Sequence, residues 1–269
     1  MTATRYPIKA VVFDWAGTMV DFGSRGPVEA FRSVFQNEGV DVTEDEIRAP
    51  MGLPKRAHIQ EMLQNASITA KWRERFGREP DGTDLDRLYA VFQAGSDDII
   101  LGYSDVIKDA PNVVDSLRGR GLKIGSTTGY TRALIERVAH RAATQGYRPD
   151  NIVAADDLSH GRPTPLAMYK CFIDLAVWPA DSVVKVDDTA PGIAEGKAAG
   201  CITVGVLASG NAVGISASAF AQLAEPERSQ RLETARAELA SAGADYTVET
   251  VAELPELLDR MSAGDETSL

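Results

Sequence analysis

The sequence predicts an α/β protein with a doubly wound parallel sheet and an inserted all-helical domain. From residue 104 onward, short β-branched runs alternate with helical patterns, which is typical of a parallel sheet covered by helices on both faces. Residues 23–103 contain only helical patterns and directly follow one buried strand. We therefore expect a core of residues 1–22 and 104–269 and a helical domain of residues 23–103.

Each expected element has its own signal along the chain. The first strand is the short, apolar and β-branched run IKAVVFD. Helical patterns follow from Pro27 to Gly39, in TEDEIRAPMG with a cap at Thr43, and then in LPKRAHIQEML, ITAKWRERFG and DLDRLYAVFQAGSDDIIL. After Pro111 the expected strands are LKIGSTTG, NIVAADD, SVVKVDD and CITVGVL, with helices between them. A charged helical segment of residues 216–243 and a closing helix complete the chain.

Composition and charge exclude several function classes. The 269 residues are 44% hydrophobic and 25% charged, which is ordinary for a globular protein. A net charge of -11 argues against binding to nucleic acid or to an anionic membrane, because both need a positive surface. Two cysteines, no leader pattern and no apolar run of about 18 residues favour a cytoplasmic protein.

Polar side chains follow the expected strands at the point where each strand ends. Because the carboxyl ends of parallel strands meet at one edge of a sheet, we expect these side chains to lie together. Carboxylates from two strands can hold Mg²⁺, and hydroxyls with a cation can bind a phosphoryl group. The residues concerned are Asp14, Ser126, Thr127, Thr128, Arg162, Asp187 and Asp188.

This inventory predicts phosphoryl chemistry. Asp14 can attack phosphorus and form an aspartyl phosphate. A metal ion and Arg162 can offset the negative charge of the phosphoryl group, so that an anionic nucleophile can approach it. Backbone N–H groups near Gly17 and the threonine or serine hydroxyls are expected to hold the phosphoryl oxygens.

Four motifs, FDWAGT, LKIGSTTGY, GRPTP and VKVDDTAPG, resemble the haloacid dehalogenase superfamily over nearly the whole chain. The resemblance implies a Rossmann-like core, and residues 23–103 match the position of its mobile helical cap domain. Phosphatases of that superfamily usually carry Asp at the position of Ala16, as general acid for an oxygen leaving group. A carbon leaving group instead needs its electrons delocalised, and an iminium formed on a lysine is a good electron sink.

The motifs FDWAGT, PMGL with Lys55 two residues later, KIGSTTGYTR and GRPTP are similar to the phosphonoacetaldehyde hydrolase (phosphonatase) family. This resemblance implies that Lys55 forms a Schiff base with the aldehyde and that Asp14 takes the phosphoryl group. Acetaldehyde then leaves through an enamine, and water hydrolyses the aspartyl phosphate. The implied reaction cleaves the phosphorus–carbon bond of phosphonoacetaldehyde during 2-aminoethylphosphonate degradation. The implied assembly is a homodimer paired through the caps.

The resemblance also implies ligands for Mg²⁺ and for the substrate. Asp14, the backbone carbonyl of Ala16 and Asp188 are the implied ligands of Mg²⁺. His58 lies three residues after Lys55 and shares its helix face, which makes it a candidate catalytic residue for handling protons. The other candidate substrate-binding residues are Met51, Gly52, Ser126, Thr128 and Tyr130.

Two assignments stay open at this point. The family suggests Thr128 as the phosphoryl contact, while the register of the strand also allows Ser126. The fourth motif often has a further acid four residues after its main Asp, and here that place is Gly192. Asp187 then compensates as a group beside the metal, so the division of roles between Asp187 and Asp188 is open.

Two alternative functions compete with this one. A phosphatase or phosphomutase of the same superfamily would act on a small phosphate ester, and the alanine at position 16 speaks against it. A non-catalytic phospho-acceptor module would use Asp14 for signalling. That module has no use for the large helical insertion or for Lys55.

Overall fold

The computed structural model describes residues 7–263, and its centre is a five-stranded parallel sheet. The order β2-β1-β3-β4-β5 places the second strand on one side of β1 and the third on the other. This reversal of strand order beside β1 is the point where open α/β sheets bind ligands. The strands are β1 (Ala10–Phe13), β2 (Lys123–Ser126), β3 (Val183–Asp187), β4 (Ile202–Val206) and β5 (Tyr246–Val248).

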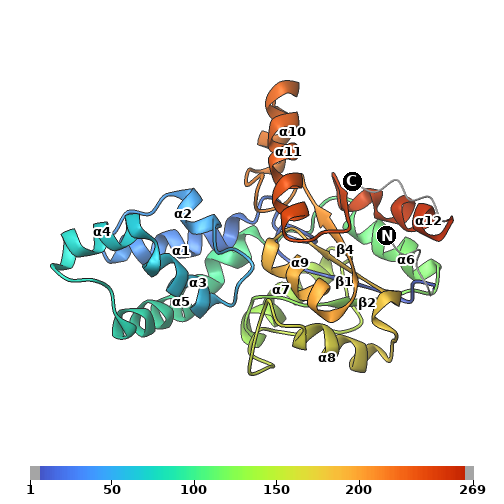
Figure 1. The fold of residues 1–269 in the computed structure, drawn as a ribbon, viewed down its shortest axis with the longest axis horizontal. Helices are drawn as coiled ribbons and strands as arrows, with labels where there is room; N and C mark the ends of the chain where they lie inside the picture. Colours follow the sequence, from blue (N-terminus) through green and yellow to red (C-terminus); the bar gives the residue numbers. More distant parts are fainter. Residues whose placement is uncertain (1–6, 264–269) are drawn as a thin grey trace.

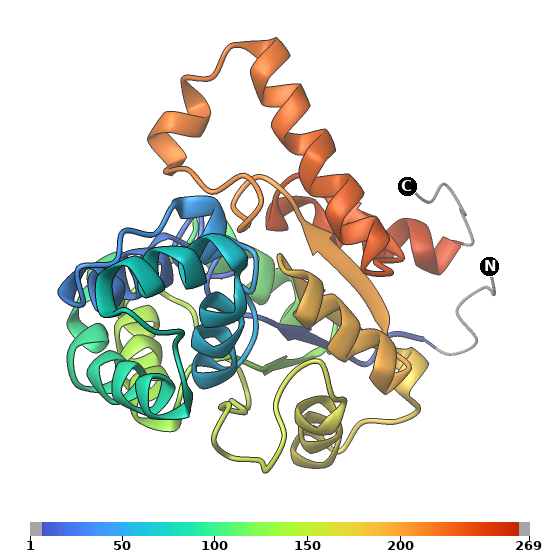
Figure 2. The same ribbon diagram turned by 60° about the vertical axis from the view of Figure 1, so that its left-hand side comes forward.

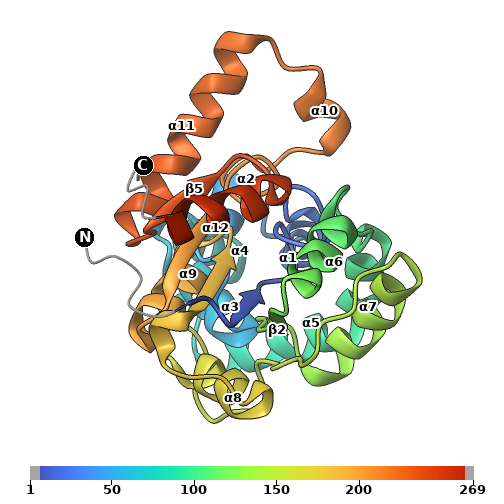
Figure 3. The same cartoon turned by 90° about the vertical axis from the view of Figure 1, so that its right-hand side faces the viewer.

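Helices cover both faces of the sheet, as the sequence predicts (Figure 3). Strand β1 shows why: Val11 and Phe13 pack into one hydrophobic core, while Ala10 and Val12 pack into another. One face carries α6 (Ala110–Gly119), α7 (Arg132–Thr144) and α12 (Leu254–Ala263). The other carries α8 (Leu166–Leu175), α9 (Ala190–Ala199) and α11 (Glu225–Ser241). Two short 3₁₀ helices, η1 (Ala180–Ser182) and η2 (Val251–Glu253), precede β3 and α12.

Five of the six helices between β1 and β2 lie to one side of the sheet, and we call residues 23–103 the cap (Figure 1). They are α1 (Arg25–Asn37), α2 (Glu44–Arg48), α3 (Lys55–Gln64), α4 (Ala66–Phe76) and α5 (Gly82–Tyr103). Phe31 of α1 and Phe92 of α5 stack at a ring distance of 4.7 Å in the middle of the cap. Thr43 caps α2 as predicted, since its hydroxyl accepts a hydrogen bond from the Glu46 N–H.

The prediction of a strand in NIVAADD is wrong. Within the described residues this segment makes a single bridge, between Val153 and Thr127, the residue that follows β2. Side chains explain the difference, because Asp150 Oδ2 accepts from the Ile124 N–H and Asn151 Oδ1 accepts from the Ser126 N–H. Those two N–H groups are the ones a sixth strand would need for its ladder.

The segment 216–243 is helical, as predicted, and consists of α10 (Ala217–Ala221) and α11. The end of α11 packs on the sheet side through Ala235 and Leu239, while α10 and the start of α11 project away from the sheet (Figure 2). Among residues 7–263, none of the helices has both the length and the apolar character that crossing a bilayer requires.

Candidate active site

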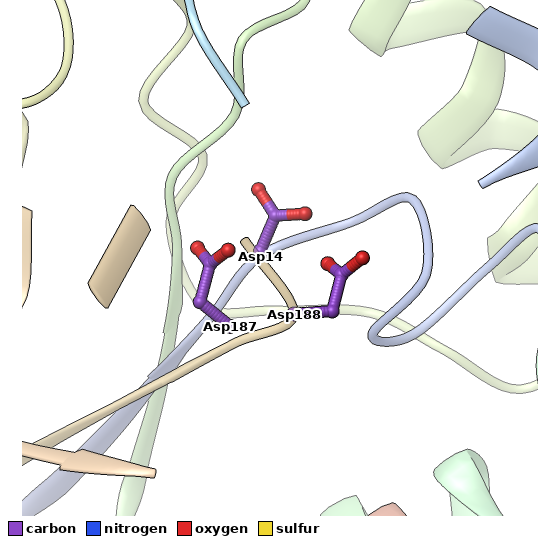
Figure 4. A group of neighbouring side chains, drawn as sticks. All are labelled: Asp14, Asp187 and Asp188. Atoms are coloured by element: carbon purple, nitrogen blue, oxygen red, sulfur yellow. The ribbon is translucent and has the colours of Figure 1, made fainter. Parts of the chain in front are cut away.

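Three carboxylates meet where β1 and β3 end (Figure 4). The Asp14 N–H still donates to the Val186 carbonyl at 2.9 Å, so the pairing of β1 with β3 fixes the backbone under the carboxylate. Asp187 is the last residue of β3, and Asp188 follows it. Each of the three acids offers an oxygen within 4.8 Å of the others. The sequence predicted this cluster from the strand ends alone.

Negative charge is in excess at this cluster. Burial, and then the charge of Asp187, raise the pKa of Asp14 to about 6, against the opposing effects of Arg162 and Lys185. Burial and the neighbouring carboxylates raise the pKa of Asp188 well above its usual range. Burial alone would raise the pKa of Asp187 too, but Lys185 and Arg162 outweigh it and hold that pKa below its usual value. The positive charges of Arg162 and Lys185 therefore do not offset the negative charges of Asp14 and Asp188.

Arg162 is buried and uses two of its three nitrogens inside the protein. Its Nη2 lies 2.7 Å from Asp14 Oδ1 and also donates to the carbonyl and hydroxyl of Thr127. Its Nε lies 3.2 Å from Glu195 Oε2. Its Nη1 has no hydrogen-bond partner among residues 7–263 and is available to an anion in the adjoining pocket.

Two residues of this network, Lys185 and Glu195, were missed by the sequence reasoning. Both are completely buried. Lys185 Nζ lies 2.9 Å from Asp187 and 3.4 Å from Glu195, and it donates to the Thr127 hydroxyl at 2.7 Å. The run SVVKVDD contains the signal: a lone cation in an apolar strand, two residues before an acid, shares one face of the strand with that acid.

The three hydroxyl groups at the end of β2, on Ser126, Thr127 and Thr128, differ in the acceptors that their protons can reach. Ser126 Oγ donates to the Asn151 carbonyl, and Thr127 Oγ1 donates to Glu195. Thr128 Oγ1 accepts from the Tyr130 N–H, which leaves its own proton free, and Thr128 lines the pocket beside Asp14. Only Thr128 of the three therefore has a hydroxyl proton available for a phosphoryl oxygen.

Gly192 and Asp187 fit together sterically. A Cβ at position 192 would lie 1.9 to 2.2 Å from the carboxylate atoms of Asp187. The Asp187 carboxylate thus fills the space where a side chain at 192 would begin. There Oδ1 accepts from the N–H and hydroxyl of Thr189, and Oδ2 faces Lys185 and Arg162. Asp187 is committed to partners within the protein, whereas the partners of Asp188 are uncharged.

The turn after Asp14 brings backbone groups to the site. Gly17 has φ +82°, and a Cβ on it would lie 2.2 Å from Asp188 Oδ2, so only glycine allows this approach. Its N–H donates to the Val20 carbonyl and is not free for a phosphoryl oxygen. Among residues 7–263, the N–H groups of Trp15 and Ala16 and the carbonyl of Ala16 have no hydrogen-bond partner.

A small pocket lies between the cap and the Asp14 carboxylate. Gly52 makes the close approach possible: its φ is +92°, and a Cβ there would lie 2.4 Å from the Thr189 hydroxyl. Of the candidate site residues Met51, Lys55, His58 and Tyr130, all but His58 line this pocket. The full lining is Asp14, Ala16, Ser24, Pro27, Met51, Gly52, Lys55, Thr128, Gly129, Tyr130, Arg162 and Thr189.

Lys55 is the buried amine of this pocket, with 7% of the residue exposed. Its Nζ lies 5.1 Å from the ring centre of Tyr130 and 5.5 Å from that of Phe31. Burial lowers the pKa of Lys55 to about 8; the Asp14 charge opposes this shift and the Arg162 charge adds to it. An amine with this pKa is substantially neutral near pH 8, which nucleophilic attack on a carbonyl requires.

His58 is placed differently from Lys55. Its ring is fully buried and stacks on Phe31 at 3.8 Å, and its Nε2 lies 2.9 Å from the Ile47 carbonyl. That carbonyl can only accept, so Nε2 carries the proton and Nδ1 is the free nitrogen. Burial, and then the Lys55 charge, lower the pKa of His58 well below its usual value. His58 is a neutral group behind the pocket wall.

The chain is similar to a known family of hydrolases over most of its length. The family model of haloacid dehalogenase-like hydrolases matches residues 8–200. A phosphonoacetaldehyde hydrolase of Paraburkholderia xenovorans (strain LB400) is 42% identical over 247 residues, which cover 92% of each chain. One of Bacillus cereus (strain AH820) is 39% identical over 254 residues, covering 94% of this chain and 96% of the relative.

A solved structure is also closely similar. The crystal structure of a phosphonoacetaldehyde hydrolase-like protein from Oleispira antarctica matches with a TM-score of 0.93 and 38% identity. The match covers 96% of this chain and 95% of that one. The chain therefore belongs to the phosphonoacetaldehyde hydrolase family of the haloacid dehalogenase-like hydrolases.

Proposed function

We propose that this protein hydrolyses the phosphorus–carbon bond of phosphonoacetaldehyde, giving acetaldehyde and phosphate in 2-aminoethylphosphonate degradation. One observation carries the proposal: a buried amine of lowered pKa, Lys55, lines the same pocket as the buried carboxylate Asp14. The relatives named phosphonoacetaldehyde hydrolase support the choice of substrate.

The first step joins the aldehyde to Lys55. The neutral amine attacks the carbonyl carbon, water leaves, and a protonated imine forms on Nζ. The positive nitrogen then lies two bonds from the carbon that carries phosphorus. The rings of Phe31 and Tyr130, which already face Nζ, can stabilise this cation through their π faces.

The second step transfers the phosphoryl group to Asp14. Its Oδ1 is held by Arg162, while its Oδ2 has no hydrogen-bond partner among residues 7–263 and is free to attack phosphorus. The electron pair of the phosphorus–carbon bond moves to the imine nitrogen and leaves a neutral enamine. Arg162 Nη1, the Thr128 hydroxyl and the N–H groups of Trp15 and Ala16 receive the phosphoryl oxygens.

Two hydrolyses complete the reaction. The enamine takes a proton on carbon, and water releases acetaldehyde from Lys55. A second water attacks the aspartyl phosphate and releases phosphate. No acid is needed at position 16, because the leaving group is a carbon whose charge was already neutralised. His58 stays a candidate for proton handling: it lies on the same helix as Lys55, behind the pocket wall, and its Nδ1 has no hydrogen-bond partner among residues 7–263.

The acidic cluster fits Mg²⁺. Hard oxygen donors gather there, with Asp14, Asp188 and the unpaired carbonyl of Ala16 as the proposed ligands and Asp187 beside them. The excess of negative charge at Asp14 and Asp188 is what a divalent cation would offset. Bound Mg²⁺ would supply positive charge to the phosphoryl oxygens.

The test is trapping of the imine. Borohydride with phosphonoacetaldehyde should reduce a covalent adduct on Lys55, seen by mass spectrometry, and inactivate the enzyme. Lys55→Arg should abolish both adduct and turnover, while the matched cap variant Lys71→Arg should retain both. An enzyme that stays active in borohydride plus substrate would refute the imine.

Two further measurements separate the alternatives. Acetaldehyde release with and without Mg²⁺ tests the reaction itself, and a panel of small phosphate esters tests phosphatase activity. Ester hydrolysis that survives Lys55→Ala would favour a phosphatase. The homodimer paired through the caps stays a prediction, which light scattering on the purified protein measures.

A further inference from the structure

We infer that Arg48 is a positioning residue. It holds the cap segment of residues 49–55, which carries Lys55, against the core loop of residues 209–214 beside Asp188. Arg48 is the last residue of α2, and Met51 and Lys55 follow it closely. The inference rests on the proposed function, since it explains how two reacting groups from two parts of the chain are held in one register.

The guanidinium of Arg48 joins three separate segments. Its Nη1 donates to the carbonyl of Gly23, where the chain enters the cap, at 3.0 Å. The same nitrogen reaches the carbonyl and side-chain oxygens of Asn211 at 3.3 and 3.1 Å, and Nη2 donates to the Gly214 carbonyl at 2.7 Å. The Arg48 side chain is 11% exposed, so these bonds are largely shielded from water.

The site is shaped for this side chain. Gly214 has φ +71°, and a Cβ on it would lie 2.8 Å from Arg48 Nε. The contact is also reciprocal, because the Asn211 side-chain amide donates back to the carbonyl of Arg48 at 3.2 Å. Glu44, one turn earlier in α2, pairs with the guanidinium from the cap side. A lysine has one charged nitrogen and cannot span these acceptors.

The core end of this contact holds the site directly. The backbone N–H of Asn211 donates to Asp188 Oδ2 at 2.8 Å, and the Ser209 hydroxyl donates to the Gly17 carbonyl at 2.6 Å. Direct hydrogen bonds therefore run from the cap segment through Arg48 and Asn211 to Asp188. Without the Arg48 guanidinium, only the bond from the Asn211 side-chain amide to the carbonyl of residue 48 remains of this connection, and the positions of Lys55 and Asp14 relative to each other are held less firmly.

The experiment combines kinetics with hydrogen exchange. Arg48→Met should lower kcat/KM by about ten- to hundredfold, since a small misplacement of reacting groups is enough for such a loss. Arg48→Lys should recover little of it. Backbone amides of residues 49–55 and 209–214 should both exchange about tenfold faster, while those of β2 stay unchanged. Asn211→Ala keeps the N–H that binds Asp188 and, combined with Arg48→Met, should add little further loss.

Arg56→Met is the matched control. Arg56 follows Lys55 directly but forms only an exposed ion pair with Asp86, so activity and exchange should stay within about twofold of the wild type. Faster exchange confined to α2, or losses that simply add in the double variant, would overturn the inference. If the wild type released no acetaldehyde, the proposed function would fail, and the exchange data would still decide the role of Arg48. Arg48→Lys and Asn211→Ala serve the same purpose if Arg48→Met does not fold.

Discussion

Two buried lysines, Lys185 in the core and Lys55 in the cap, face opposite surroundings. Lys185 lies within ion-pair distance of Asp187 and Glu195 and donates to the Thr127 hydroxyl. Lys55 forms no ion pair among residues 7–263 and faces two aromatic rings instead. Carboxylates beside a buried lysine stabilise its charged form, so that the lysine is a structural ion-pair partner. Burial without them leaves an amine whose charged form is disfavoured, which is the state that can attack an aldehyde.

The same contrast extends to the acids and bases around each lysine. On the core side, Arg162, Asp14 and Asp187 hold one another in fixed positions. Around Lys55, His58 of the cap has a single hydrogen-bond partner, and the Oη of Tyr130, a core residue that faces Lys55, has none among the described residues. We call Asp14, Arg162, Asp187, Lys185 and Glu195 the core wall, and Lys55 with the facing rings of Phe31 and Tyr130 the cap wall. The core wall stabilises charge for phosphoryl transfer. The cap wall disfavours the charged form of Lys55, so that the imine can form. The variants below break one wall at a time.

Asp14→Asn removes the core nucleophile alone and should have the largest effect. Turnover should fall by at least about 10⁴-fold, because the amide cannot accept the phosphoryl group. Borohydride with substrate should still trap Lys55, since imine formation uses only the cap wall. Phosphate release is the measurement, and Asp86→Asn on the cap surface is the control. Loss of the trapped adduct together with turnover would show that the two walls do not work separately.

The pH dependence tests the cap wall. Because the pKa of Lys55 is about 8, the neutral amine becomes about tenfold scarcer for each pH unit below that value. The rate of borohydride trapping should therefore rise by about tenfold from pH 6 to 7 and about fivefold from pH 7 to 8, and level off above about pH 9. A rate still rising steeply from pH 9 to 10 would mean that Lys55 titrates like an exposed lysine.

Glu195→Gln breaks the core wall without touching the pocket. Glu195 accepts from Arg162, Lys185 and Thr127, so its loss leaves buried cations short of a partner. Unfolding free energy should fall by about 3 kcal/mol, measured by urea titration. kcat should fall by about tenfold, because the Arg162 guanidinium loses one of its anchors and moves relative to the Asp14 carboxylate. The rate of imine trapping should stay at the wild-type value. Glu233→Gln on the exposed face of α11 is the matched control and should change neither quantity.

The sequence predicted the fold and most of the site because both follow from short-range patterns. Asp14, Lys55 and Arg162 were found from motifs, and the structure brings them to one pocket. Other features depend on partners far along the chain. The Thr127 hydroxyl donates its hydrogen bond to Glu195, 68 positions away, and no local pattern shows that. The failed strand NIVAADD has a related cause, since apolar spacing does not reveal that Asp150 and Asn151 side chains occupy the edge of β2.

Lys55→Met tests the comparison of the two lysines through the free energy of unfolding, where we expect the smallest of these effects. The pKa of Lys55 is lower in the folded protein than its unfolded value of 10.5, so the unfolded chain binds the proton more tightly. The resulting destabilisation is full below about pH 8 and disappears as pH rises towards 10.5. Methionine has a similar length and no charge. At pH 7 the free energy of unfolding of the variant should therefore be about 2–3 kcal/mol higher than that of the wild type. Near pH 10.5 the two free energies of unfolding should be equal.

Lys185→Met is the matched variant of the core wall and should move in the opposite direction. It leaves Asp187 and Glu195 without one of their cations, so unfolding free energy should fall by about 3 kcal/mol. Urea titrations of both variants at pH 7 and at pH 10 give the comparison. If both substitutions destabilised equally, Lys55 would be a paired structural lysine like Lys185. A gain for Lys55 alone would show that the protein gives up stability to keep an unpaired amine in its pocket.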